Sequence, residues 1–567
     1  MRSNSPNRPV VKSLKKMLIV PLSLYACLDL SGATNLDKMD TSGGQPMTAL
    51  VNASAGKMFF DLNSDQPASV RFFGSPEANL FTKEISESYA GVLRKNYISD
   101  SGGRFPRGFV RASPPGQGWA DTFWTRDGGT FLRELVLWGY TQHACQTAAC
   151  LMQLVGKDDD GFYSFPEYFS KGDKRSGKEL DGTSAIVIGM VLLYERLPVN
   201  DPFKAKLHDF LHGPSSPALY IRERLRAGPL IAGEGEFGGG CGIRGEFYNV
   251  VQNNLAMLAL TSMGKMEAQG GDSSLAASYF QDAQTIRDNM DKYLVDSDGA
   301  WIWCIDPKTL KPDPQVINNE INKGSGGLNG VACMYSDVLG SEPLASKWNG
   351  IEHCQKTFNK LFSFPLRKEQ FDQYGIWTQF DVYRAGCSSG PSYGDGYALQ
   401  TMLLFDELEM ADKSLSWLAN STYKPIEPYH VDRESPYFFY ERSYSPEAVG
   451  KTPLDQGCGA LNLVNVSEPL KAARLIVGVD DTSPEEVKII PRIPPSWRGV
   501  EAVNWPIRTS RGIPRAWIRC ERTPGGLRFE IKLSGGQKIP RVAVRLDGRW
   551  FRAQEVSVLE LANGKSD

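Results

Sequence analysis

The feature that most constrains the fold of this chain is a long succession of helix-type patterns separated by long loops. From about residue 81 onward, apolar residues recur at i, i+3, i+4 and i+7 in one segment after another. Loops at alternate junctions, such as 98–127 and 231–245, carry Gly, Trp, Asp and Glu, and loops of this length in a compact domain are usually functional. This arrangement predicts helical hairpins set in a ring. The predicted helices span 81–97, 129–142, 145–154, 183–197, 202–211, 218–226, 246–263, 274–294, 330–339, 344–361, 397–409, 413–418 and 454–461.

The pattern changes near Pro484, where short runs of β-forming residues begin. Runs of this kind, bounded by Gly, Pro and Asp, predict strands rather than helices. We therefore predict a helical ring over residues 79–483 and a small antiparallel β-domain over 484–567. The predicted strands span 487–491, 515–520, 527–533 and 542–546.

The N-terminus has the layout of a secretory signal peptide. Basic residues precede a mostly apolar run over 17–30, and Ser31-Gly32-Ala33 supplies the small residues of a cleavage site. The prediction is a signal peptide over 1–33, a leader over 34–78, and a secreted or periplasmic protein with no integral membrane segment after cleavage. Lipoprotein anchoring through Cys27 is the alternative.

Charge and composition narrow the range of ligands. The chain has 567 residues, of which 63 are basic and 65 acidic, for a net charge of −2. This balance provides no global positive field for nucleic acid or anionic lipid. The 12 Trp, 21 Tyr and 27 Phe are compatible with stacking on sugars or with a large core, and composition does not decide between these two roles.

Cysteine and histidine spacing predicts no cofactor and no metal site. Nine cysteines remain after cleavage; they are scattered, without a C-x-x-C pair, and their odd number argues against a complete disulfide framework. We expect most of them to be small buried residues. The pair His208 and His212 has the only metal-like spacing, and its helical sequence H-D-F-L-H supplies no third ligand.

One segment resembles the second-helix region of the glucoamylase family. Ala112-Ser113-Pro114 is followed by Trp124-Thr125-Arg126-Asp127-Gly128, and Asp181-Gly182-Thr183 resembles a second loop of that family. The resemblance implies a mainly α, (α/α)6 toroid and the chemistry of an inverting glycosidase. It implies that Arg126 and Asp127 hold hydroxyls of the terminal sugar, so that cleavage is exo-acting. Trp124 is a stacking wall or a core residue, and Asp127 and Asp181 bind sugar or cap their helices.

Two further segments follow in the order of that family, and together they imply the catalytic pair. Gly245-Glu246 lies where the family carries its general acid, and Tyr440-Glu441-Arg442 lies where it carries its general base. Inversion needs one protonated and one ionised carboxyl with water between them. The Gly-rich approach and the aromatic neighbours of Glu246 are expected to desolvate its carboxyl, which raises a pKa. The alternative roles are a helix-dipole contact for Glu246 and a surface salt bridge to Arg442 for Glu441.

Several other acids are candidates for substrate binding or catalysis, and the sequence leaves several functions open. Asp395, flanked by glycines before a helix, is a further candidate for substrate binding; Glu234, Glu236 and Glu369 compete for the catalytic positions. The favoured function is an exported exo-acting glycoside hydrolase acting on oligo- or polysaccharides, with α-glucosides as one candidate substrate class. The alternatives are a rhamnosidase-like or other six-hairpin glycosidase, a disaccharide phosphorylase, and a sugar-binding toroid without catalysis. A polysaccharide lyase is disfavoured by the five scattered histidines.

Overall fold

The computed structural model describes most of the chain between residues 65 and 562, and all described residues belong to one unit that spans 46–567. The described residues are 65, 67–99, 103–116, 119–233, 246–302, 304–312, 350–363, 368, 371–372, 389–391, 393–423, 442–444, 461, 463–510, 512–524, 526–533, 541–546, 548–553 and 558–562. The predicted signal peptide and the predicted helix 330–339 lie outside them.

Three helices from the first half of the chain are buried on nearly all of their faces. They are α3 (Thr125–Leu137), α5 (Leu180–Arg196) and α8 (Val250–Gly270), and α5 packs against both of the others. Glycine permits the contact between α3 and α5, because a Cβ on Gly129 would lie 2.7 Å from the backbone of Ala185 and Ile186. A helix that is buried on nearly all of its faces belongs inside a protein, so these helices form the inner ring.

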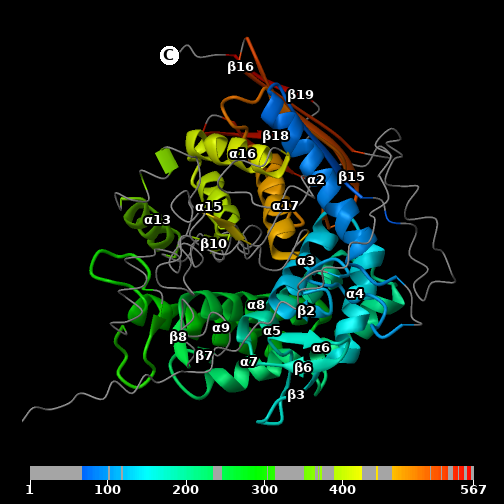
Figure 1. Ribbon diagram of the computed structural model, residues 1–567, viewed down its shortest axis with the longest axis vertical. Helices are drawn as coiled ribbons and strands as arrows, with labels where there is room; N and C mark the ends of the chain where they lie inside the picture. The colour runs from blue at the N-terminus through cyan, green and yellow to red at the C-terminus, as the bar shows by residue number, and fades with distance from the viewer. Residues whose placement is uncertain are drawn as a thin grey trace, which may run out of the picture. The chain divides into compact units, whose positions relative to one another are not determined.

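Two later helices close this ring. α15 (Tyr393–Leu404) packs against α17 (Leu463–Val477), and α17 packs against α3, the first helix of the inner ring. Figure 1 shows α15 and α17 side by side. Helices from both ends of the chain are therefore neighbours, which brings loops that are far apart in sequence to one ring.

The remaining helices lie before, between and after the inner ones along the chain and form the second ring. α9 (Ser273–Tyr293) is typical, because it buries a single stripe at spacings of three and four: Ala276, Tyr279, Ala283, Ile286 and Met290. The predicted (α/α)6 architecture thus has its physical basis in the contrast between fully buried and one-sided helices. The other helices outside the inner ring are α2 (Pro76–Lys95), α4 (Thr141–Leu154), α6 (Pro202–His212), α13 (Gly350–Phe362), α16 (Leu408–Tyr423) and the short α7 (Pro217–Leu225), which follows α6 in the same connection between α5 and α8.

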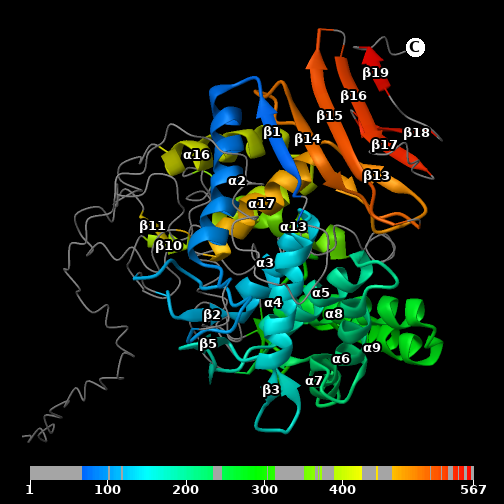
Figure 2. The ribbon, with the colours of Figure 1, turned by 90° about the vertical axis from the view of Figure 1, so that its right-hand side faces the viewer.

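Two sheets make up the β region. An antiparallel sheet has the order β1 (Ser69–Phe73), β14 (Gly499–Pro506), β15 (Arg515–Thr523), β16 (Gly526–Leu533) and β19 (Val558–Ala562), as Figure 2 shows in part. A second sheet has the order β12 (Val479–Asp480), β13 (Val487–Ile489), β17 (Val542–Leu546) and β18 (Arg549–Ala553). The pair β13–β17 is parallel. This sheet is therefore mixed, whereas the sequence predicted an antiparallel β-domain.

The edge strand of the larger sheet comes from the other end of the chain. β1 lies in the segment predicted as a leader, yet Phe72 of β1 is the register partner of Val500 of β14. The Phe72 ring also lies 5.3 Å from Phe81 of α2 and 5.0 Å from Trp497. A strand preceding the first helix therefore completes the C-terminal sheet, and its aromatic residue joins that sheet to the helices.

A buried ion pair ties the last helix of the ring to the first. Arg474 of α17 donates from Nε and Nη2 to the two carboxylate oxygens of Glu134 on α3, at 2.8 and 2.7 Å. Trp138 Nε1 donates to the same carboxylate at 3.2 Å. Burial acts to raise the pKa of Glu134, but the charge and hydrogen bonds of Arg474 outweigh it and the pKa is lowered.

A second buried carboxyl has no such partner. Both oxygens of Glu84, on α2, are buried and accept no hydrogen bond from the residues described. Burial raises the pKa of Glu84 well above its ordinary value of 4.5. The folded chain therefore retains a proton there that the unfolded chain releases above about pH 4.5, and stability falls as the pH rises through the folded-state pKa.

We expect Glu84→Gln to raise the midpoint of thermal unfolding at pH 7, because the amide is neutral in both states and folding no longer requires a carboxylate to take up a proton. At pH 4 the two proteins should differ much less, since the native carboxyl is then protonated in both states. Glu87→Gln, on the same helix but only partly buried, is the control. Thermal unfolding at several pH values measures this, and a variant less stable than the native chain at pH 7 would contradict it.

Two helices differ from what the sequence predicted. The helix predicted over 246–263 begins at Val250, because Phe247–Asn249 forms β8 and the Asn249 side chain caps α8. α17 was not predicted, and Pro469 lies inside it, although proline normally interrupts a helix. The five cysteines described as free are buried, as expected: Cys145, Cys150, Cys304, Cys354 and Cys520. Within the described ranges, no helix combines the length and the apolar character that a membrane span requires.

Candidate active site

Short strands lead directly into three of the inner helices. β2 (Thr122–Trp124) precedes α3, β8 (Phe247–Asn249) precedes α8, and β10 (Ser389–Pro391) precedes α15. Most of the predicted site residues lie at these strand–helix junctions or in the first turn of an inner helix. The fold thus provides a common structural context for residues that the sequence places far apart.

An arginine surrounded by carboxylates occupies the first turns of α3 and α5. Arg126 Nε lies 3.5 Å from Asp127 Oδ1, and Arg126 Nη1 lies 3.5 Å from Asp181 Oδ2 and 3.8 Å from Glu179 Oε1. All four side chains are buried. Buried charges are stable only when they are paired, so the guanidinium and the three carboxylates hold each other in place. We call this group the Arg126 cluster.

Close contacts of the Thr125 side chain fix the start of α3 beside the start of α5. Thr125 Oγ1 donates to the Pro166 carbonyl at 2.5 Å. A Cβ on Gly182 would lie 2.1 Å from Thr125 Oγ1 and 3.0 Å from Glu179 Oε2. Only glycine permits this approach of α5 to α3, which explains in physical terms why Asp181 is followed by glycine.

Aromatic rings lie next to the Arg126 cluster in sequence and in space. Trp124, the residue that precedes α3, packs against Tyr168 with ring centroids 4.7 Å apart and against Trp119 at 5.3 Å. All three rings are only partly buried. An accessible aromatic face beside buried charged groups is suited to a ligand with both apolar and hydroxyl faces.

The Ala112 segment joins the junction before α3 to the start of α17. Ala112 donates its N–H to the Thr122 carbonyl at 2.8 Å and accepts from the Leu463 N–H at 3.0 Å. Asn96 donates to the Leu461 carbonyl at 3.0 Å. The first turns of α3, α5 and α17 are therefore linked, although more than 300 residues separate α3 from α17 in the chain.

Glu246 has surroundings that differ from those expected. Its side chain is 54% exposed, and its carboxylate lies 3.5 Å from Arg224 Nη2. It precedes β8 and does not begin a helix, so a contact with the N-terminus of α8 does not explain it. The expected desolvation by Phe247 and Tyr248 is wrong for the arrangement described. Its role as general acid remains a prediction.

The other predicted acids are described only in part or not at all. Glu441, Glu234, Glu236 and Glu369 lie outside the described residues. Asp395 is in the first turn of α15, and only its backbone is described. Glu441 directly precedes β11 (Arg442–Tyr444), whose residue Arg442 pairs with Pro391 of β10, two residues before α15 begins.

One member of the Arg126 cluster was missed by sequence reasoning. Glu179 precedes α5 and is buried at 3.8 Å from Arg126. Its position two residues before Asp181 was the available signal, because two acids so close together at a predicted helix start are candidates for a shared cation. The structure thus brings together Arg126, Asp127 and Asp181 as a group and adds Glu179.

Comparisons with known proteins support the fold. No protein-family model matches the sequence, and a search of the curated proteins finds no match. Among solved structures, the chain is similar to a rhamnosidase from Bacillus sp. GL1, with a TM-score of 0.54 and 14% identity over 85% of this chain and 43% of that chain. It is also similar to an α-L-rhamnosidase from Aspergillus terreus, with a TM-score of 0.50 and 13% identity over 88% of this chain and 50% of that chain.

These similarities establish the architecture. The chain has the six-hairpin (α/α)6 fold, with a C-terminal β region, that these glycosidases share. The fold predicted from the sequence is confirmed. At this level of identity the likeness concerns the fold alone, and the chain spans half or less of the length of the two rhamnosidases.

Proposed function

We propose that the protein is an exo-acting glycoside hydrolase that inverts the configuration of the sugar it releases. The observation that carries this proposal is the Arg126 cluster at the start of two inner helices, next to the partly exposed rings of Trp124, Trp119 and Tyr168. Guanidinium and carboxylate groups bind vicinal hydroxyls, and aromatic faces bind the C–H face of a sugar ring.

The charge of the Arg126 cluster favours hydrolysis over phosphorolysis. Arg126 faces the carboxylates of Asp127, Glu179 and Asp181, so negative groups outnumber the cation in this set. A phosphate dianion would meet repulsion beside it, whereas a neutral sugar and a water molecule would not. Phosphorolysis is the alternative outcome that the activity assay below distinguishes from hydrolysis.

Glu246 and Glu441 are the proposed acid and base. In an inverting enzyme the two carboxyls stand roughly 6.5–9.5 Å apart so that a water molecule fits between them. Both residues adjoin short strands that lead into inner helices or pair with such strands: Glu246 precedes β8, and Glu441 precedes β11. That common context supports the pair. Export through the predicted signal peptide is part of the same proposal and suits a substrate outside the cell.

The direct test is a substrate panel. Purified protein is incubated with nitrophenyl α- and β-glycosides, including α-L-rhamnoside and α-glucoside, and with di- and oligosaccharides, with and without inorganic phosphate. We expect free monosaccharide to be released from chain ends independently of phosphate. Release only with phosphate would support a phosphorylase, and binding without product would support the sugar-binding alternative.

Asp127→Asn is expected to lower kcat/KM by roughly 10- to 150-fold, because a hydrogen bond to a charged group contributes about 1.5–3 kcal/mol. The amide keeps the shape of the side chain and removes its charge. Asp121→Asn, an exposed carboxylate six residues upstream that pairs with Arg104, is the matched control and should retain full activity. Equal activity of the Asp127→Asn and Asp121→Asn variants would exclude Asp127 from the substrate site.

Arg126→Ala is expected to affect folding as well as substrate binding. Its removal leaves the buried carboxylates of Asp127, Glu179 and Asp181 without their common cation. An uncompensated buried charge is strongly destabilising, so loss of activity in this variant is expected together with loss of stability. Asp127→Asn therefore separates substrate binding from folding better than Arg126→Ala.

A further inference from the structure

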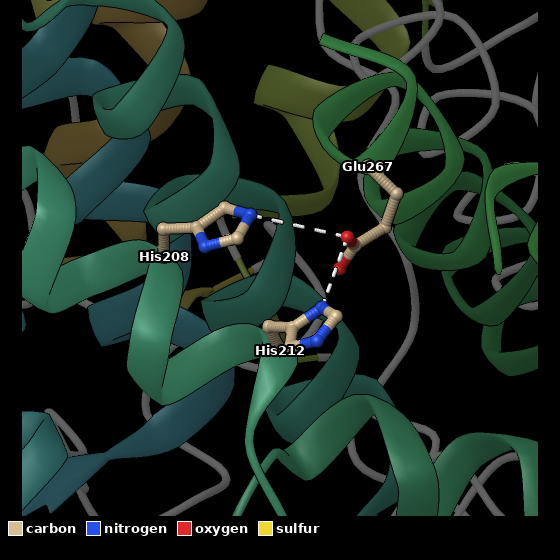
Figure 3. A group of neighbouring side chains, drawn as sticks. All are labelled: His208, His212 and Glu267. Carbon is tan, nitrogen blue, oxygen red and sulfur yellow. Dashed lines mark hydrogen bonds and ion pairs between the residues drawn. The ribbon is translucent and has the colours of Figure 1, made fainter. Parts of the chain in front are cut away.

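The side chains of two histidines on α6 and one glutamate on α8 form a compact group. His208 and His212 lie one turn apart on α6, and Glu267 lies near the end of α8. Figure 3 shows both imidazole rings beside the Glu267 carboxylate. His212 Nδ1 is 3.1 Å and His208 Nε2 is 3.9 Å from Glu267 Oε2, and one ligand atom from each residue falls within 4.8 Å of the others.

Among the residues that the structure describes, no lysine or arginine pairs with this group. The Glu267 side chain is 1% exposed, and its described ion pairs are only with the two histidines. Within the described residues, Glu267 Oε1 and His208 Nε2 are buried and have no hydrogen-bond partner. A buried carboxylate oxygen and an imidazole nitrogen left in this way are costly unless a further group binds them.

We propose that His208, His212 and Glu267 bind a borderline divalent metal ion, for which Zn²⁺ is the best match. Two imidazole nitrogens and one carboxylate suit Zn²⁺, whereas Ca²⁺ and Mg²⁺ require mostly oxygen ligands. Zinc bonds to nitrogen and oxygen are about 2.0–2.2 Å long, so small side-chain rotations bring the three ligand atoms into range. The His212 side chain is 44% exposed, which leaves the fourth position open to water.

Glycine allows α8 to approach the imidazole ring. Gly270 lies in the last turn of α8, and a Cβ there would be 3.0 Å from His208 Nε2. The rings of His208 and His212 are nearly parallel, with centroids 5.4 Å apart and an interplanar angle of 13°. The helix positions thus orient both rings toward one carboxylate, as a shared ion requires.

This metal would stabilise the toroid and would not take part in sugar cleavage. Glu267 is 17 residues beyond Val250, the first residue of α8, which corresponds to about 25 Å along a helix. The proposed active site lies at the first turns of the inner helices, so the metal group is at the opposite end of α8. An ion there would join α6 of the second ring to α8 of the inner ring, and the inference is independent of the proposed activity.

The experiment uses the full chain, free of any affinity tag and treated with chelator. Zn²⁺ is titrated by calorimetry and by thermal unfolding, with Mg²⁺ as the comparison ion. We expect one Zn²⁺ per chain and a midpoint of unfolding that rises with the logarithm of free Zn²⁺, because the ion binds the folded state. Mg²⁺ should leave the midpoint unchanged. Co²⁺ in place of Zn²⁺ should give visible absorption bands from nitrogen and oxygen ligands.

Two variants make the test specific. His212→Ala removes an exposed ligand and should weaken Zn²⁺ binding by roughly 100-fold or more, since even outer-shell changes cost 10- to 100-fold. Asp209→Asn removes an exposed carboxylate from the same helix and should bind as the native chain does. Glu267→Gln should abolish the Co²⁺ bands.

Three results would overturn the proposal. They are the absence of saturable Zn²⁺ binding to the native chain, unchanged Zn²⁺ binding in His212→Ala, and a loss of Zn²⁺ binding in Asp209→Asn as large as that in His212→Ala. The second would mean adventitious binding at the surface only. Circular dichroism of the metal-free variants checks that each is folded. If a variant does not fold, the Co²⁺ spectrum of the native chain still shows whether nitrogen and oxygen ligands bind the ion.

Discussion

Replacing Glu441 by glutamine is expected to lower kcat by a factor on the order of 10²–10⁴ for every substrate that the protein cleaves. The reason is that activation of water is common to all substrates, and removal of a general base costs this much. Glu441 lies between a run of aromatic residues and Arg442. An adjacent cation keeps a carboxylate ionised, as a base requires.

The comparison with Glu246→Gln separates the two roles. A general acid matters most when the leaving group needs protonation, so Glu246→Gln should impair poor leaving groups far more than nitrophenol. Glu434→Gln, seven residues before Glu441 in the same segment, is the control and should retain activity. If the kcat of Glu441→Gln is within a few-fold of the kcat of the native chain, Glu441 is not the base, and Glu369 is the next residue to vary.

Arg474→Ala is expected to destabilise the protein by about 3–5 kcal/mol, the usual cost of removing one partner of a buried ion pair. Both carboxylate oxygens of Glu134 receive hydrogen bonds from Arg474, and this contact links α17 to α3. Without the guanidinium, the ring would carry an unpaired buried carboxylate where it closes. Denaturant unfolding of the variant and the native chain measures the difference.

An exposed pair provides the control for this prediction. Arg71 and Glu501 are 2.6 Å apart, but the Arg71 side chain is 59% exposed. Surface pairs contribute only about 0–1 kcal/mol, so Arg71→Ala should change stability little. Equal effects of Arg474→Ala and Arg71→Ala would show that the buried pair does not hold the ring closed.

The same pair determines how stability responds to acid. The pKa of Glu134 is lowered in the folded state from an ordinary value of 4.5. Its stabilisation is therefore present above about pH 4.5 and is lost as the pH falls through the folded-state pKa. Protonation of Glu134 leaves Arg474 as a buried cation without its partner. In Glu134→Gln this acid-dependent part of the stability should be absent.

The ring of helices was predicted from helical periodicity and from long loops at alternate junctions, and the structure adds that inner and outer helices differ in how many of their faces are buried. The segment 183–197 is apolar on all sides, and the observed helix α5 spans Leu180–Arg196. α9 shows a single apolar stripe over its whole length. These patterns depend only on which faces are buried, so they survive without knowledge of the partners.

Features that depend on tertiary contacts were not predictable in this way. α17 tolerates Pro469 because its packing against α3, α2 and α15 compensates for the lost backbone hydrogen bond. β1 has no partner near it in sequence and pairs with β14 more than 400 residues later. Likewise, the sequence showed His208 and His212, but not Glu267, which is 55 residues beyond His212.

The candidate site was predicted in part, for a related reason. Arg126, Asp127 and Asp181 were selected because their local motifs resemble those of glucoamylases, and the fold places these three side chains in contact. Glu246 was expected at a helix start with an enclosed carboxyl, but β8 intervenes and its side chain is half exposed. Local motifs locate first turns of helices, whereas exposure depends on loops that come from elsewhere in the chain.

The proposed function requires that this toroid cleaves glycosidic bonds with inversion at a site that includes Asp127. The most direct measurement is proton NMR of a glycoside during the first minutes of its reaction with the native chain and with Asp127→Asn. We predict that the native chain releases a sugar of the opposite anomeric configuration to the bond that is cleaved, and that Asp127→Asn does so roughly 10- to 150-fold more slowly at low substrate concentration. A product of retained configuration, or equal rates for the two proteins, would contradict the account.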